Sequence, residues 1–135
     1  MTERVYAILS MLIVQFFLGM GENVLGTPAS DASTLHNAVA GIVLGLHALT
    51  AIGIIIAAVQ INRLRPNASP WVQKWTVRGA ASVGLAFVSG LLTLATSWSE
   101  FFSFLMASGF ILAFTSYGLV LLSLSSKQRP SKPAK

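Results

Sequence analysis

The chain has 135 residues, of which 54% are apolar and only 10% are charged. Soluble domains usually carry about 25% charged residues, so the composition excludes an ordinary soluble domain. The net charge of +5 does not indicate nucleic-acid binding, because the basic residues lie at the N-terminus, in the middle connection and in the tail. The absence of cysteine excludes disulfides, thiolate metal sites and iron–sulfur clusters.

Four apolar segments follow one another along the chain, and each predicts a helix, at about 5–22, 35–62, 76–96 and 100–125. Each supplies roughly the 17–25 residues that cross a hydrocarbon core of about 30 Å. Helices are expected because they satisfy every backbone amide internally. The predicted fold class is an all-α integral membrane protein with four transmembrane helices in an antiparallel bundle. Residues 1–126 form this domain, and 127–135 form a basic cytoplasmic tail.

The first segment has an alternative interpretation as a cleavable signal peptide, since Arg4 precedes its apolar core. Two features argue against it. Gln15 interrupts the apolar run, and "GMGENVLG" lacks the small residues of a cleavage site. We therefore predict that the segment is kept as a helix.

The distribution of charge predicts the orientation. The first and third connections carry acidic residues and no basic ones, whereas the middle connection and both ends are basic. Under the positive-inside rule, both termini are expected to be cytoplasmic. The expected location of this multi-pass protein is the plasma membrane. The tail is expected to lie near anionic lipid headgroups. Trp71, Trp75 and Trp98 fit an interfacial aromatic belt.

The second segment, "STLHNAVAGIVLGLHALT", holds both histidines of the chain, His36 and His47. They are eleven residues apart, which places them on one helix face about 16 Å apart along the axis. His36 is expected near the outer interface and His47 near mid-membrane. Intramembrane ionisable residues suggest function, although each imidazole could instead make only a structural contact. Gly41 and Gly45 form a G-x-x-x-G on the opposite face, for which packing within the chain is the expected use.

Helix one contributes two further polar residues, Gln15 and Glu22, seven residues apart and therefore on one face. Glu22 is a candidate proton acceptor from the outer solvent, or a partner for the second N–H of an imidazole. An exposed carboxylate at the start of a loop is the plain alternative.

The histidine pair restricts the choice of metal. Zinc needs three or four ligands close together, which two imidazoles about 16 Å apart cannot provide. Haem iron takes one or two axial ligands, and a four-helix apolar interior can enclose it. The sequence therefore predicts His36 and His47 as axial ligands of b-type haem at two separate sites, each needing a partner from another helix, with Met106 as a weak candidate for a further ligand.

The two halves of the chain are alike. Aligning them pairs Gly19 with Gly90 and Gly41 with Gly109, and sets His36 opposite Leu105–Met106. A hypothesis of two parallel, duplicated hairpins follows. The second hairpin has no histidine.

The stretch "VQFFLGMGENVLGTPASDASTLHNAVAGIVLGLHAL" resembles one hairpin of a heme A synthase-like four-helix membrane bundle. The matching positions are Gln15, Leu18, Gly19 and His36. The resemblance implies that His36 is an axial haem ligand on the outer side. The glutamate that the family places three residues before its histidine is missing, and so is the second histidine helix. A symmetric homodimer would supply the missing ligand from its second copy.

Three functions follow as hypotheses. The first is intramembrane electron transfer or haem modification by a cytochrome b-like protein. The second is a non-catalytic accessory or assembly subunit of a larger membrane complex, such as a respiratory one. The third is a small transporter that uses His47, Gln15 and Glu22 as a proton path. The expected partners are the lipid bilayer and a second copy or a larger complex, and the sequence leaves enzymatic activity undecided.

Overall fold

The computed structural model describes residues 1–26, 32–96 and 99–126, and within them it contains only helices and their connections. The four long helices are α1 (Thr2–Leu25), α2 (Thr34–Leu64), α3 (Pro70–Ala95) and α4 (Glu100–Ser126), and a 3₁₀ turn, η1 (Arg65–Asn67), follows α2. All four helices are long and apolar enough to cross a membrane. The prediction of an all-α chain with four such helices is confirmed.

The third helix begins earlier than predicted, at Pro70 rather than at residue 76. Proline is favoured in the first turn because its fixed φ suits the helix and its missing N–H would have no partner there. Trp71 and Trp75 consequently lie on the first turns of α3, with ring centroids 5.8 Å apart. The guanidinium of Arg78 lies 4.7 Å from the centroid of the Trp75 ring. Asp31, Trp98 and the tail 127–135 lie outside the described residues.

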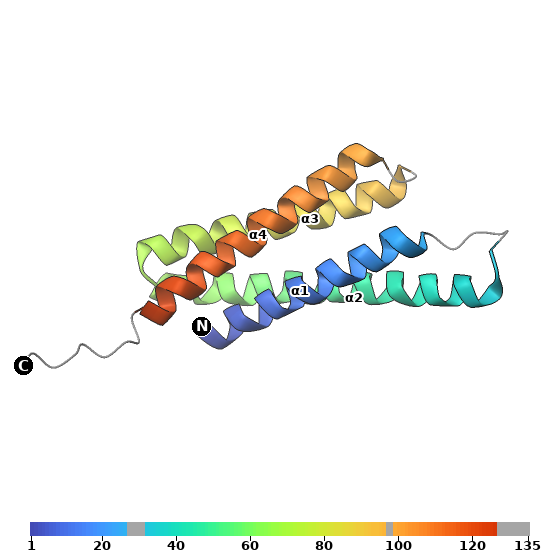
Figure 1. The fold of residues 1–135 in the computed structure, drawn as a ribbon. Helices are drawn as coiled ribbons and strands as arrows, with labels where there is room; N and C mark the ends of the chain where they lie inside the picture. Colours follow the sequence, from blue (N-terminus) through green and yellow to red (C-terminus); the bar gives the residue numbers. More distant parts are fainter. Residues whose placement is uncertain (27–31, 97–98, 127–135) are drawn as a thin grey trace, which may run out of the picture.

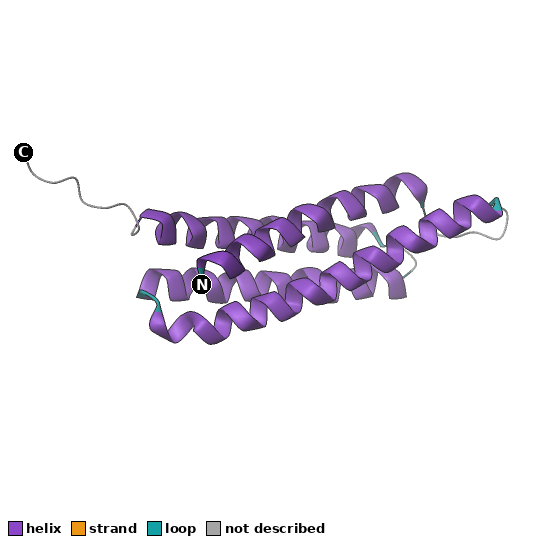
Figure 2. Ribbon diagram, turned by 90° about the horizontal axis from the view of Figure 1, so that it is seen from below, coloured by secondary structure: helices purple, strands orange, loops and turns teal. Residues whose placement is uncertain are grey.

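The helices form two antiparallel hairpins, α1–α2 and α3–α4, seen in Figure 1 as the lower and upper pairs. The start of α1, the end of α2, the start of α3 and the end of α4 share one end of the molecule, here the terminal end. The end of α1, the start of α2, the end of α3 and the start of α4 share the opposite end, here the loop end (Figure 2). The two hairpins contact each other through α2 with α3 and α1 with α4.

The apolar core joins the two hairpins mainly in their terminal half. Its fully buried members come from all four helices and include Val5, Ile8, Ile61, Val72 and Tyr117. The Tyr117 ring lies on Gly79, where an added Cβ would come within 2.9 Å of the ring carbon Cζ. A glycine is needed at this position because a side chain would displace the aromatic ring from the core.

The backbones of α3 and α4 approach each other closely at Gly109. A Cβ there would lie 2.8 Å from the backbone nitrogen of Ala86 and 3.0 Å from the carbonyl oxygen of Ser82. Because both neighbours are backbone atoms, they cannot move without shifting the helix. Small residues at such crossings let helices pack closely where no hydrophobic effect drives them together.

Gly41 and Gly45 do not pack within the chain, contrary to the expectation from their G-x-x-x-G spacing. Both are exposed, and an added Cβ would have no atom within 4 Å at either position. The sequence shows that the spacing allows close approach, but only the arrangement of the helices decides which face meets a neighbour. Here the glycine face of α2 is turned outward.

Large apolar side chains cover the outward surfaces of the helices. Phe17 on α1, Leu35 on α2 and Phe104 on α4 are 67%, 75% and 68% exposed. Soluble monomers rarely expose contiguous apolar surface of this kind. The outward faces are as apolar as the interior, which is the pattern of a helix that is hydrophobic all round.

We expect Gly109→Leu to destabilise the protein by about 1–3 kcal/mol or more, because overpacking against backbone forces α3 and α4 apart. Gly41→Leu is the matched control, since its side chain would enter open space. Thermal unfolding in detergent followed by circular dichroism measures both variants. Equal unfolding midpoints for the two would contradict the close α3–α4 contact.

Candidate functional site

The site is positioned by the antiparallel register of α1 and α2. Arg4 donates a hydrogen bond to Gln60, Met11 contacts Gly53, and Gly21 lies against Val43. Each step along α1 toward the loop end is matched by a step back along α2. This register places the last turn of α1 opposite the middle of the histidine-bearing half of α2.

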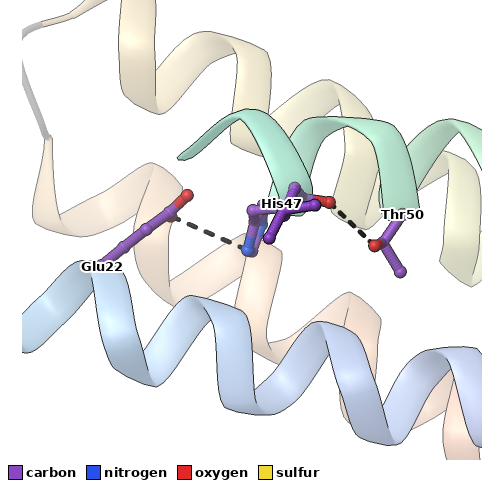
Figure 3. A network of polar contacts seen from close by, with 4 residues as sticks. Glu22, His47 and Thr50 are labelled. Carbon is purple, nitrogen blue, oxygen red and sulfur yellow. Dashed lines mark hydrogen bonds and ion pairs between the residues drawn. The ribbon is translucent and has the colours of Figure 1, made fainter. Parts of the chain in front are cut away.

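Glu22 and His47 meet at this point (Figure 3). The Nδ1 atom of His47 lies 3.8 Å from the Oε2 atom of Glu22, and only 17% and 11% of the two side chains are exposed. The separation fits an ion pair but is too long for a hydrogen bond. The two groups are therefore close enough to share a proton after a small side-chain movement or through one water molecule.

Gly19 makes room for the imidazole. A Cβ at Gly19 would lie 3.3 Å from Cε1 and 3.7 Å from Nδ1 of His47. The ring thus lies directly over the α1 backbone, one turn before Glu22. Because α1 has no side chain at this position, His47 can lie against the α1 backbone and face the carboxylate.

Three buried polar atoms in this region have no hydrogen-bond partner among the described residues. They are Oε1 of Gln15, Oε1 of Glu22 and Nδ1 of His47. Leaving one such atom unpaired costs about 1–3 kcal/mol, and more for a charged group. Gln15 and Glu22 share a face of α1 at a separation of about 10 Å along its axis. The Gln15 and Glu22 atoms therefore lie on one face of α1, and the His47 atom faces Glu22 from α2.

Thr50, one turn after His47, does not complete the pair. Its Oγ1 donates to the backbone carbonyl of Leu46 at 2.8 Å, as drawn in Figure 3. Its hydroxyl proton is thus used within α2. The partner that the imidazole meets among the described residues comes from α1.

Glu22 lies in the last turn of α1, close to the loop end. Its carbonyl oxygen accepts the N–H of Gly26, which ends the helix with φ at 69°. This is the left-handed region that glycine adopts without penalty. The chain can leave the helix just beyond Glu22, and the carboxylate stays near the loop end.

His36 lies apart from this pair. Ser33 caps α2, and its Oγ accepts the backbone N–H of His36 at 3.2 Å. The register carries the first turn of α2 past the end of α1, and Figure 1 shows α2 extending beyond it. His36 therefore stands at the start of its helix, where the structure gives it a part in the N-cap.

Met106, the weak ligand candidate, packs inside the second hairpin. Its sulfur lies 3.2 Å from the Cβ that Gly90 would carry. The same arrangement occurs in the first hairpin, where His47 lies over Gly19. The predicted pairing of Gly19 with Gly90 thus corresponds to similar packing, with Met106 in the place of His47 rather than of His36. The other predicted pair differs, because Gly109 is tightly packed and Gly41 is open.

The described residues contain no group of three or more acidic, histidine or cysteine side chains that could hold a metal ion. A single haem iron cannot use both histidines, since about 16 Å separates them along one helix. Of the two histidines, His47 has a contact that is typical of a metal ligand. A ligating histidine commonly presents its other ring nitrogen to a carboxylate, as Nδ1 of His47 does to Glu22. The atom left to bind a metal would be Nε2.

The pairing of Glu22 with His47 can be predicted only in part from the sequence. Both residues can be identified from their positions in apolar helices, but their contact depends on the α1–α2 register. The sequence signal for this contact is Gly19, three residues before Glu22, because a glycine there leaves space for a large side chain beside the carboxylate.

Comparisons of the chain with protein-family models, curated proteins and solved structures found no match.

We expect Gly19→Leu to move the His47 ring away from Glu22, because the new side chain would occupy the space of Cε1. Gly45→Leu is the control on the open face of α2. With only two histidines in the chain, imidazole NMR signals can be assigned individually, and His36 serves as an internal reference. A His47 signal that is unchanged in Gly19→Leu would contradict the geometry.

Proposed function

We propose that this chain is an integral membrane protein with four spans, and that Glu22 and His47 take up and release a proton within it. The observation that carries the proposal is the 3.8 Å approach of the two titratable side chains. Ionisable groups inside membrane helices are rare and usually serve a proton or substrate path. The protein would act as a proton-coupled component of the membrane.

The proposed chemistry uses the two side chains, brought together by a small movement or bridged by one water molecule. The proton can be held on a carboxyl oxygen of Glu22, which leaves both groups neutral. It can instead be held on Nδ1 of His47, which gives an ion pair. Because the titration of one group alters the charge that faces the other, the two are expected to behave as one coupled site. The unpaired Gln15 oxygen offers an additional acceptor on the same helix face.

We expect a proton to reach Glu22 and His47 from the loop end only. Glu22 lies one turn from the end of α1. Toward the terminal end, the core closes with fully buried side chains such as Ile8, Ile61 and Val120. A one-sided site suits proton acceptance for a bound substrate or partner better than it suits a channel.

The orientation proposed for the membrane follows from the charges. Arg4, Arg63, Arg65, Lys74 and Arg78 lie on the helix turns of the terminal end, whereas Glu22 and Glu100 lie at the loop end. The positive-inside rule then places the terminal end in the cytoplasm. The loop end and its proton site would face the outside of the plasma membrane.

The test is histidine NMR of the full chain in liposomes, with the pH changed on one side at a time. We expect His47 to respond to the solution at the loop end, and we expect Glu22→Gln to shift its titration midpoint. Glu100→Gln is the control, because this exposed carboxylate lies at the same end. A His47 midpoint that is equal in wild type and Glu22→Gln would refute the coupled site.

Haem binding is the second candidate, and one specific observation favours it. Nδ1 of His47 faces a carboxylate, as expected for the ring nitrogen of a ligating histidine that does not bind the metal. His47 would hold the iron through Nε2, Glu22 would orient the ring, and a bound haem would supply one-electron chemistry. His36 or Met106 would have to ligate from a second copy or a second site.

If haem is bound, protein expressed with a haem supply will show a reduced-minus-oxidised absorption difference. We expect His47→Ala to abolish this signal, because it removes the ligating nitrogen, and His36→Ala to keep it. A colourless preparation refutes the haem candidate and leaves the proton site standing. Loss of colour in His36→Ala alone would move the ligand to the start of α2.

A further inference from the structure

A groove lies between α2 and α3, away from the Glu22–His47 pair. Its volume is about 310 Å³, and it is lined mostly by aliphatic and small side chains, including Ile55, Val59, Val83 and Gly84. An added Cβ at Gly84 would meet no atom within 4 Å. The groove is therefore open along α3 and apolar for most of its length.

One end of the groove is polar. Asn62 and Arg63, both near the end of α2, line it together with the apolar residues. The Oδ1 atom of Asn62 is buried and has no hydrogen-bond partner among the described residues. Arg63 is exposed. From Ile55 to Arg63 the groove extends roughly 12 Å along α2, at 1.5 Å per residue.

The charge around this end is mostly positive. Arg63, Arg65, Lys74 and Arg78 lie on the turns that flank the connection from α2 to α3, and residues 56–99 include no Asp or Glu. Of the acidic residues that the structure describes, Glu3 lies at this end, exposed on the first turn of α1. A ligand at the groove would thus meet a positive field.

We propose that this groove binds one molecule of an anionic phospholipid with a hydroxylated headgroup. The phosphate binds the Arg63 guanidinium, a headgroup hydroxyl donates to Oδ1 of Asn62, and an acyl chain lies along the apolar lining. A second copy of the chain fits the groove less well, because it would have to bring an anion to Arg63 and a hydrogen-bond donor to Asn62. Basic pockets between membrane helices on the cytoplasmic side are suited to anionic headgroups. The proposal goes beyond the proton site and shares with it only the placement in a membrane.

The test uses the full chain in nanodiscs of mixed phosphatidylglycerol and phosphatidylcholine, released for native mass spectrometry. Wild type is expected to retain one phosphatidylglycerol. Arg63→Gln should weaken this retention about tenfold or more, because it removes a charge-assisted hydrogen bond. Lys74→Gln is the matched control, since it removes a cation from the same end that does not line the groove.

A second variant, Gly84→Leu, fills the groove from the open side and should abolish retention while the unfolding midpoint stays unchanged. If Gly84→Leu does not fold, the retention measured for Arg63→Gln decides whether the lipid binds in the groove. Inorganic phosphate added to phosphatidylcholine nanodiscs should leave the unfolding midpoint unchanged, because the acyl chain is required. Equal retention of the two lipids, equal effects of Arg63→Gln and Lys74→Gln, protection by phosphate alone, or a second copy of the chain in the groove would overturn the proposal.

Discussion

The approach of the α1 backbone to the His47 ring is the constraint on which the candidate site depends. Gly19 leaves the space that the ring occupies, and the antiparallel register then brings the Glu22 carboxylate to Nδ1. A larger residue at Gly19 would separate the two titratable groups. The site is thus defined by the absence of one side chain as much as by the presence of two others.

The packing of the four helices divides the molecule into a terminal half and a loop half. The terminal half holds the apolar core, with Tyr117 on Gly79, and the five described basic residues of the helix turns. The loop half holds the buried polar atoms of Glu22 and His47. Burying polar atoms without partners opposes stability. The apolar core offsets this cost for Glu22 and His47 in the loop half, and for Asn62, Thr76 and Tyr117 in the terminal half. Along α2, His47 of the proposed proton site lies roughly 12 Å from Ile55, the nearest α2 residue that lines the groove, and roughly 24 Å from Arg63 at its polar end.

Glycines illustrate how one residue type serves different purposes in this fold. Gly109 permits close contact of two backbones, Gly79 accommodates an aromatic ring, and Gly19 accommodates an imidazole. Gly41 and Gly45, which have the spacing most often associated with packing, meet no neighbour. The spacing of small residues therefore indicates where close approach is permitted, whereas the partner depends on how each helix is rotated.

Composition and periodicity by themselves determined the all-helical class, the four helices and the shared face of His36 and His47, because these depend only on local pattern and length. Tertiary structure alone decided that Glu22 reaches His47, that His36 stands beyond the end of α1, and that Met106 packs on Gly90. These contacts depend on the register and rotation between helices. Hydrophobic helices are similar on all faces, so their sequences carry little information about which face turns inward.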